Sequence, residues 1–290
     1  MAAESDAPAR LRELQQLIAD HDHHYHVLGT PLVSDAEYDA LFRELLELEE
    51  AHPEAVGPDS PSRRVGGALL EGFERVAHAV PMLSIESLFG EEEVGEFLAR
   101  ISRGLGTEDL PAMACEPKYD GVSASLVYED GAFVLGVSRG DGAHGEDLTA
   151  NLSTIRTVPL ALRGSAPGLL EVRGEIMIRR DRFEEMNREM EAAGEPVFAN
   201  PRNSCAGTLK RLDSRVVASR PLECVAWDLV RWEGGDEAMP ATHAASMDRL
   251  EEMGFRSSPH RTVCERAEAV VAYHHEREAA RDDDPFEMDG

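Results

Sequence analysis

The chain has 290 residues, of which 42% are hydrophobic, and its formal net charge at pH 7 is −27. This length exceeds the usual size of a single core and favours one large domain with a small one. Proteins that grip nucleic acid along its backbone normally present a basic face, so the acidic balance argues against that role unless a small cationic patch and further parts of the protein supply it. No stretch approaches the ~18 apolar residues of a membrane span.

The cysteine pattern and the start of the chain bear on its compartment. The four cysteines, Cys115, Cys205, Cys224 and Cys264, lie far apart and form no C-x-x-C pair. This spacing argues against a zinc site or a disulfide framework, and reduced cytosolic thiols are the simple interpretation. The N-terminal stretch is charged and lacks the apolar segment of a signal peptide. We therefore expect a cytoplasmic protein.

Two helices joined by a short turn are expected at the start of the chain. Apolar residues recur with helical spacing over residues 8–28, before a glycine and a proline. The second helix should begin after Ser34, which forms a capping box with Glu37, and should end near His52. The histidine-rich segment 21–26 and the acidic and aromatic residues across the turn could cradle a cationic aromatic ligand. From composition alone, a solvated hairpin end is the simpler interpretation.

The next part of the chain predicts a linker and then strands. Residues 53–80 hold several prolines and glycines and are typical of a linker, and a helix is expected over residues 91–104. Residues 112–138 alternate as strand, turn, strand, turn, strand. Lys118 should lie at the end of the first of these strands, and residues 129–131 should form a tight hairpin turn.

A glycine-rich loop over residues 139–147 leads into an expected helix that carries Leu148, Leu152 and Ile155. The loop lacks the patterns of a P-loop or a dinucleotide-binding fold. Residues 169–178 alternate as a strand that places Arg173 and Glu175 on one face. A helix should follow from Asp181 to near the next glycine.

The last third begins with a polar, small and cationic segment over residues 198–210, which suits a loop and short helix facing an anion. An ordinary helix cap would explain the same residues. A strand is expected over residues 222–230, and helices are expected over residues 241–253 and 265–281.

Lys118 stands out chemically. It and Lys210 are the only lysines in the chain, and a lysine amine, unlike a guanidinium, can be deprotonated and used as a nucleophile. Lys118 lies between Glu116 and Asp120 and is followed by Gly121. A reactive amine on a turn between strands is one interpretation. An exposed lysine paired with its acidic neighbours is the other, and for an isolated K-x-D-G it would be preferred.

The ordered set of motifs along the chain resembles the N-terminal half of the bacterial NAD-dependent DNA ligases. The motifs are Tyr25-His26-Val27, Ser34-Asp35-Ala36-Glu37-Tyr38-Asp39, Asp59-Ser60-Pro61, Pro81-Met82-Leu83-Ser84, Glu116-x-Lys118-x-Asp120-Gly121, Arg139-Gly140-Asp141-Gly142-x-x-Gly145-Glu146-Asp147, Glu171-Val172-Arg173-Gly174-Glu175 and Phe198-Ala199-Asn200-Pro201-Arg202-Asn203. Each piece is short, but the set in this order covers almost the whole chain.

This resemblance implies an α+β fold in two domains. Residues 1–72 would form a helical hairpin domain that recognises the nicotinamide mononucleotide (NMN) half of NAD. Residues 73–290 would form an ATP-grasp-like nucleotidyltransferase (adenylation) domain with antiparallel sheets, incomplete at its C-terminus.

The resemblance also implies roles, position by position. The residues that would contact NMN are Tyr25, His26, Asp35, Tyr38 and Asp39. The residues that would line the adenosine site are Ser84, Ile85, Glu116 and Arg139, with Glu175 near the ribose. The implied catalytic residues are Lys118, the nucleophile, with Asp120 and Arg202. Lys210 would face the phosphates together with Arg202. Arg281 matches a further arginine of the family. No protein residue is expected to be a metal ligand.

The implied reaction begins with attack of the Lys118 amine on the α-phosphorus of NAD, which releases NMN and forms a lysyl-AMP phosphoramidate. Lysine amines, with an ordinary pKa of roughly 10.4, are mostly protonated at neutral pH, so nearby cations or desolvation must favour the attacking form. Mg²⁺ or Mn²⁺ and arginines would offset the phosphate charge. In the complete family enzyme, AMP then passes to a 5′-phosphorylated nick in double-stranded DNA, a step used in DNA replication and in the repair of DNA damage. The resemblance implies a monomeric bacterial protein associated with the nucleoid and not with a membrane.

The chain departs from the family pattern at two places. Lys210 stands where many members have arginine, so the charge is kept but the bidentate fork is lost. The chain ends at Asp289-Gly290, before two further lysines, the oligonucleotide-binding fold, the zinc module and the remaining domains of the family. Zinc is therefore expected only in that absent part, and a truncated ligase is the expected account.

Two other functions stay open at this stage. One is an ATP-using ligase or capping-type enzyme, which also carries K-x-D-G; the helical hairpin argues against it. The other is an inactive remnant that binds the nucleotide without reacting, because it lacks lysines that would act on the phosphate charge.

Overall fold

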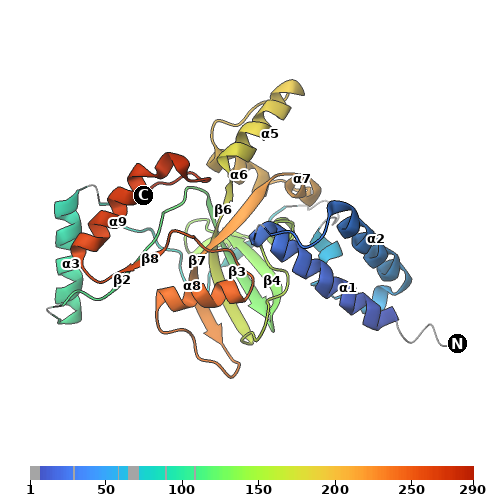
Figure 1. Cartoon of the computed structure of the whole chain (residues 1–290), viewed down its shortest axis with the longest axis horizontal. Coiled ribbons are helices and arrows are strands. Elements are labelled where there is room, and N and C mark those ends of the chain that lie inside the picture. Colours follow the sequence, from blue (N-terminus) through green and yellow to red (C-terminus); the bar gives the residue numbers. More distant parts are fainter. Residues whose placement is uncertain (1–6, 29, 58, 65–71, 89, 108) are drawn as a thin grey trace.

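The computed structural model describes residues 7–28, 30–57, 59–64, 72–88, 90–107 and 109–290. A four-stranded antiparallel sheet occupies the middle of the molecule, with the pair α1 and α2 on one side and the pair α3 and α9 on the other (Figure 1). This mixture of helices and antiparallel strands confirms the expected α+β class.

The N-terminal helices are α1 (Ala7–Asp22) and α2 (Asp35–Ala51), and they pack against each other through Leu11, Leu14, Ile18 and Leu45, which are fully buried. Ser34 caps α2 as predicted: its Oγ accepts from the backbone N–H of Glu37, and the Glu37 carboxylate accepts from the backbone N–H of Ser34. The expected single helix over residues 8–28 instead ends in a π-helical turn, η1 (His23–Val27). This turn carries the histidine-rich segment.

The central sheet has the strand order β4-β3-β6-β7. Its strands are β3 (Val122–Glu129), β4 (Ala132–Ser138), β6 (Leu169–Ile178) and β7 (Leu222–Glu233). The predicted hairpin turn joins β3 to β4, where Asp130 and Gly131 both have positive φ, 47° and 82°. Positive φ at both central residues is the requirement of the tight turns that match strand twist.

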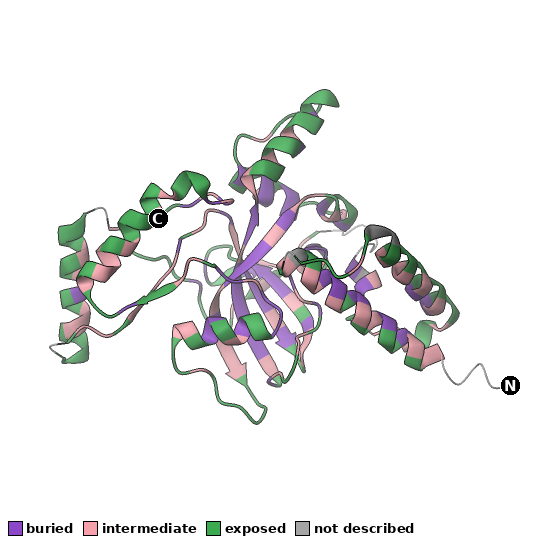
Figure 2. Cartoon of the chain, viewed as in Figure 1, coloured by how far each residue is buried: buried purple, intermediate pink, exposed green. Residues whose placement is uncertain are grey.

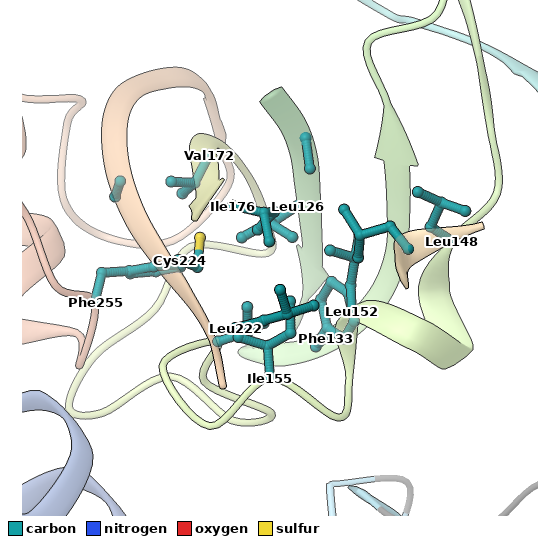
Figure 3. Packing of buried hydrophobic residues seen from close by; sticks show 14 of the residues in the cluster. Leu126, Phe133, Leu148, Leu152, Ile155, Val172, Ile176, Leu222, Cys224 and Phe255 are labelled. Atoms are coloured by element: carbon teal, nitrogen blue, oxygen red, sulfur yellow. The ribbon is translucent and has the colours of Figure 1, made fainter. Parts of the chain in front are cut away.

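Buried side chains of the sheet and of the helices around it form one hydrophobic cluster. The helices are α4 (Thr149–Leu152), α5 (Arg180–Ala192), α6 (Pro201–Leu209), α7 (Ser214–Ala218) and α8 (His243–Glu252). Leu126, Val172 and Ile176 from the strands pack with Leu152 and Phe255 (Figure 3). Burial is concentrated in the sheet, whereas the outer part of α5 is mostly exposed (Figure 2). The main hydrophobic cluster is thus centred on the sheet.

Two further sheets have only two short strands each. β1 (Arg75–Ala77) pairs with β5 (His144–Glu146), and β2 (Met113–Cys115) pairs with β8 (Thr262–Cys264). α3 (Glu91–Leu105) contacts α9 (Ala267–Ala279) beside the second pair. The described residues also form the 3-10 turns η2 (Pro53–Ala55), η3 (Pro61–Arg64) and η4 (Arg281–Asp283).

The structure corrects three details of the sequence-based prediction. The expected linker over residues 53–80 contains β1, which uses the glycine-rich loop as its partner strand. Lys118 lies beyond the end of β2, in the connection to β3. The helix after the glycine-rich loop is only four residues long. Within the described residues, no helix has the length and apolar character to cross a bilayer.

The hairpin is held on the core by buried charge. Arg64 Nη1 donates to the backbone oxygens of Ile155 and Val158, each at 3.0 Å, and its Nε lies 3.7 Å from Asp22 Oδ2. Arg156 Nη1 reaches the same carboxylate at 3.1 Å. Burial lowers the pKa of Arg64 to about 10. A charge taken this far from water needs its partners, so Asp22 joins the hairpin to the core.

Candidate active site

A cavity of about 660 Å³ opens beside Lys118 at one end of the central sheet. The sheet contributes Ser123 of β3, Glu175 of β6 and residues 225–228 of β7. The other walls come from the segment after β1, from the connection between β2 and β3 and from the starts of α6 and α8. The predicted site residues that line it are Ser84, Ile85, Glu116, Lys118, Arg139, Glu175 and Arg202. Other lining residues are Met82, Leu83, Ser123, Tyr119, Val225, Ala226, Trp227, Asp228, His243 and Ser258. Residues separated by more than a hundred positions thus share one concave surface.

The Lys118 amine is held by the last residues of the chain. Its Nζ lies 2.6 Å from Asp289 Oδ2. The backbone is paired as well: the Lys118 N–H donates to the Gly290 oxygen at 2.7 Å, and the Asp289 N–H donates to the Lys118 oxygen at 2.8 Å. Tyr119 packs edge-on against the buried Phe286, with ring centroids 5.7 Å apart. Segment 284–290 therefore fixes both the backbone and the side chain of Lys118.

Asp120 and Arg202 form the second charged contact at the mouth of the cavity. Arg202 Nη1 donates to Asp120 Oδ1, and this hydrogen bond raises the pKa of Arg202. The same nitrogen lies 3.9 Å from Asp289 Oδ2. Arg202 is in the first turn of α6, where Asn200 Oδ1 caps the helix by accepting from the backbone N–H of Asn203. Capping of α6 accounts for Asn200. The guanidinium of Arg202 lies beside Asp120 and Asp289.

Gly121 allows this charged turn to approach β6. A Cβ at this position would lie 2.4 Å from the backbone oxygen of Ile176 and 2.7 Å from Met177 Cγ. Both distances are far shorter than any carbon contact in a packed interior, so only glycine fits. The glycine of K-x-D-G therefore has a steric role beside the chemistry of its neighbours.

Glu175 is a partly buried carboxylate of the site. It projects from β6, and its Oε2 accepts from Ser123 Oγ at 2.7 Å. Burial raises the pKa of Glu175, because desolvation disfavours the charged carboxylate. Hydrogen bonds and the nearby Arg202 and Lys118 oppose that effect. A partly buried carboxylate beside an amine and an arginine is typical of a functional site.

At the other end of the cavity, Glu116 contacts His243. The Glu116 Oε1 and the His243 Nε2 are within hydrogen-bond distance. This contact raises the pKa of His243. Asp228 also lines this end, and burial raises its pKa. The indole Nε1 of Trp227 is buried and has no hydrogen-bond partner among the described residues.

The segment that carries Ser84 and Ile85 forms an apolar wall anchored by two arginines. Arg173 Nη2 donates to the backbone oxygens of Val80 at 2.8 Å and Pro81 at 3.0 Å. Arg139 Nη2 donates to Ser84 Oγ at 2.9 Å. The side chain of Ile85 is 70% exposed although it lines the cavity. A large apolar side chain left open to water suits contact with a flat ring.

A second cavity, of about 190 Å³, lies between the hairpin and the core. Three predicted NMN contacts, Tyr25, Tyr38 and Asp39, line it together with Arg156. Tyr38 Oη donates to Asp22 Oδ1 at 2.7 Å, and burial raises the pKa of Tyr38. The side chains of His26 and Asp35 lie outside the described part of the structure.

Among the predicted residues whose side chains are described, three line neither cavity: Asp120, which contacts Arg202, and Lys210 and Arg281. Lys210 Nζ pairs with Glu146 Oε2 at 2.9 Å on the surface. Arg281 Nη2 donates to the backbone oxygen of Met288 at 2.8 Å. Arg281 therefore supports the segment that holds Lys118, and in this conformation it does not reach the cavity.

Sequence reasoning missed several residues of the site. His243 lies 127 positions from Glu116, and no local motif marks it. Trp227 is in an apolar strand that predicts only burial. Asp289 lies 171 positions from Lys118, so no local pattern joins them. No sequence pattern marks Arg156, because its partner Asp22 lies on the hairpin, 134 positions away in the chain.

An amine beside arginines, with an apolar wall behind it, suits a nucleotide whose phosphates face Lys118. The fold and the lining of the cavity thus suit a nucleotidyltransferase. Within this class, the family model "NAD-dependent DNA ligase adenylation domain" matches residues 70–290, and "DNA ligase-like, N-terminal NAD+-binding domain" matches residues 4–66. The chain belongs to the NAD-dependent DNA ligase family.

Curated relatives agree with this assignment. The chain is 45% identical over 291 residues to the DNA ligase of Anoxybacillus flavithermus, 46% identical over 291 residues to that of Xanthomonas euvesicatoria pv. vesicatoria, and 46% identical over 288 residues to that of Geobacter metallireducens. These alignments cover 99%, 100% and 98% of the chain, but 42%, 35% and 42% of the relatives. The chain thus spans well under half the length of the proteins that it matches.

Proposed function

We propose that the chain binds NAD and transfers its AMP moiety to Lys118, the self-adenylation step of an NAD-dependent DNA ligase. The observation that carries the proposal is the single cavity that brings Lys118, Glu175 and Arg202 together with the apolar wall and Arg139. The volume of about 660 Å³ lies in the usual range of small-ligand sites.

The proposed reaction is an in-line displacement at phosphorus. The Lys118 nitrogen forms a bond to the α-phosphorus of the adenylate half, the bond to the bridging oxygen breaks, and NMN leaves. The proton of the amine must be lost on the way to the phosphoramidate. Because Lys118 Nζ is hydrogen-bonded to Asp289, the amine has to leave this carboxylate before it can approach phosphorus. Arg202 and Arg139 would offset the phosphate charge.

NMN recognition belongs to the hairpin in this proposal. Tyr25, Tyr38 and Asp39, with His26 and Asp35, would hold the NMN half, since aromatic and acidic groups suit a cationic ring. No described residue lines both cavities. We propose that the hairpin moves toward the adenylation site, so that one NAD molecule contacts both sets. We place the boundary between the two domains at residue 72.

A divalent cation, Mg²⁺ or Mn²⁺, fits this site as a partner of the nucleotide. Among the described residues, no group of three or more His, Cys, Asp or Glu side chains is placed to hold a metal ion. Mg²⁺ is commonly bound by one or two carboxylates together with substrate phosphates, without a cage of protein ligands. Glu175 and Asp289, beside Lys118, are the carboxylates that would take part. The ion would neutralise phosphate charge.

The remaining steps concern the whole protein. We propose that the adenylate passes to the 5′-phosphate of a nick in double-stranded DNA and that the 3′-hydroxyl then displaces AMP. The partners would be NAD and nicked DNA, and the protein would act as a monomer in the bacterial cytoplasm, at the nucleoid. Identity to DNA ligases along nearly the whole chain supports this part of the proposal.

The test is intact-mass measurement of the 290-residue chain after incubation with Mg²⁺ and either NAD or ATP. The proposal predicts a gain of one AMP with NAD and no gain with ATP, with NMN released in equal amount. A gain with ATP alone would instead indicate an ATP-using nucleotidyltransferase.

A thermal shift with NAD but no gain of mass would contradict self-adenylation by this chain. That result would favour the alternative of a nucleotide-binding protein that does not react. Absence of both the shift and the gain would contradict NAD binding itself.

A further inference from the structure

We propose that His243 is a positioning residue that fixes the Glu116 carboxylate for recognition of the amino group of adenine. The inference rests on the proposed function, because it assumes that the adenine of NAD occupies the end of the cavity that Glu116 lines. It adds to that function a residue that selects the base.

The geometry of the pair supports this role. His243 Nε2 and Glu116 Oε1 are within hydrogen-bond distance, and both side chains line the same cavity. His243 is the first residue of α8, and Thr242 Oγ1 caps that helix by accepting from the backbone N–H of Ala245 at 3.2 Å. Met247, in the second turn of α8, is fully buried in the core. The imidazole is thus attached to a rigid element.

Fixing the carboxylate has a chemical consequence. A histidine Nε2–H that donates to one Glu116 oxygen leaves the other oxygen as an acceptor with one orientation. The exocyclic amino group of adenine is a donor, whereas a hypoxanthine base presents a carbonyl oxygen at the same position. A site that is built to accept a hydrogen bond from the ligand discriminates strongly against a ligand that lacks the donor. A freely rotating carboxylate would lose part of this discrimination.

The charges around His243 give the pair a dependence on pH. The groups that face it are Glu116 after β2, Asp228 on β7 and Arg261 before β8; Glu116 and Asp228 raise its pKa and Arg261 lowers it. Arg261 is itself paired with Asp248 and Glu251 of α8, at 2.8 and 3.0 Å. Below its raised pKa, His243 is an imidazolium that partly offsets the two carboxylates. Above that pKa the offset is lost, which disfavours an anionic dinucleotide.

The experiment is isothermal titration of the 290-residue chain with NAD and with nicotinamide hypoxanthine dinucleotide, between pH 5.5 and 8.5. The proteins are the wild type, His243→Ala, His243→Gln and a control, His275→Ala. His275 lies on α9 in an exposed ion pair with Glu91, 3.4 Å away and outside the cavity. Glutamine keeps an N–H donor near the position of Nε2 but does not titrate.

We expect His243→Ala to weaken NAD binding about tenfold, the usual size of a lost hydrogen bond to a charged group, and to reduce the preference for NAD over the hypoxanthine analogue. His243→Gln should restore the preference and abolish the fall in NAD affinity with rising pH. His275→Ala should match the wild type.

An unchanged preference in His243→Ala would overturn the inference. If the alanine variant does not fold, a His243→Gln protein that keeps the pH dependence of the wild type would overturn it equally. Failure of the wild type to bind NAD would instead overturn the proposed function, so the two failures are distinguishable.

Discussion

Lys118 is held by a residue 171 positions further along the chain, and not by the acidic residues on either side of it. Glu116 is engaged by His243 and Asp120 by Arg202. The simpler interpretation of the sequence, a lysine paired with its acidic neighbours, is therefore wrong. Glu116 follows β2, which pairs with β8, and Asp120 precedes β3 of the central sheet, so the two carboxylates contact different partners.

The burial of Glu175 gives a prediction about stability and its pH dependence. Its pKa is raised in the folded protein, so the folded chain binds this proton more tightly than the unfolded chain does. Ionisation of Glu175 therefore costs folding free energy above the raised pKa, and the cost disappears below the unfolded value. Glu175→Gln should raise Tm by a few degrees at pH 7.5 and bring little gain near pH 4. Differential scanning calorimetry at the two pH values measures both.

Glu175→Gln should also gain less AMP than the wild type on incubation with NAD. A carboxylate that is retained although its burial costs folding free energy is typical of a functional residue. Ser123→Ala is the matched control: it removes the hydroxyl that donates to Glu175 at 2.7 Å and leaves the charge. A Glu175→Gln protein with a lower Tm than the wild type at pH 7.5 would contradict the prediction, because it would show that the partners of the carboxylate outweigh the cost of its burial.

At the scale of elements, Asp22 and Arg64 are the main link between the hairpin and the core. Asp22 accepts from Tyr38 and Arg156 and lies beside the buried Arg64. Asp22→Ala would leave Arg64 without its carboxylate, and breaking a buried pair in this way costs about 3–5 kcal/mol. Urea denaturation followed by circular dichroism should show a loss of this size.

The control for this prediction is Arg10→Ala, which breaks the exposed pair with Glu44 at 2.8 Å between α1 and α2. Exposed pairs contribute ~1 kcal/mol or less. Equal losses for the two variants would contradict the view that the buried network holds the hairpin on the core.

The elements that were predicted from the sequence are those whose determining residues lie close together in the chain. Ser34 and Glu37 are three residues apart and form their capping box wherever the chain is placed. The turn at Asp130-Gly131 similarly depends on residues that tolerate positive φ. In contrast, β1 and β5 have three residues each and no strict alternation, so only their pairing defines them. The contact of Glu116 with His243 depends on the packing of α8 against the sheet, which no short pattern encodes.

At the scale of the whole molecule, the family motifs predicted more than the physical patterns did. Composition and periodicity indicated a hairpin, a sheet and a notable lysine. The motifs predicted which distant residues share the site, and Ser84, Glu116, Lys118 and Arg202 do line one cavity. The motifs did not reveal that the Tyr38 hydroxyl is hydrogen-bonded to Asp22, away from the adenylation site. The two sets of predicted NAD contacts line different cavities, and no described residue lines both.

The net charge of −27 can be compared with the positions of the charged side chains in the structure. Lys118, Arg139 and Arg202 line the cavity together with three carboxylates, Glu116, Glu175 and Asp228, so opposite charges are nearly balanced there. The acidic excess lies elsewhere on the surface. This distribution suits a chain that binds a dinucleotide with few cations, and the alignment with longer relatives shows that they contain further sequence beyond it.

The central claim is that Lys118 is the residue that carries AMP, and the scarcity of lysine makes a direct test simple. The chain has two lysines, so Lys118→Arg and Lys210→Arg together account for every lysine amine. The measurement is intact mass at the end point of incubation with NAD and Mg²⁺, with peptide mapping of the labelled residue afterwards. We predict that Lys118→Arg gains no AMP, whereas Lys210→Arg reaches the same final mass as the wild type with the label on Lys118. A gain of AMP by Lys118→Arg, or a label on Lys210, would contradict the account.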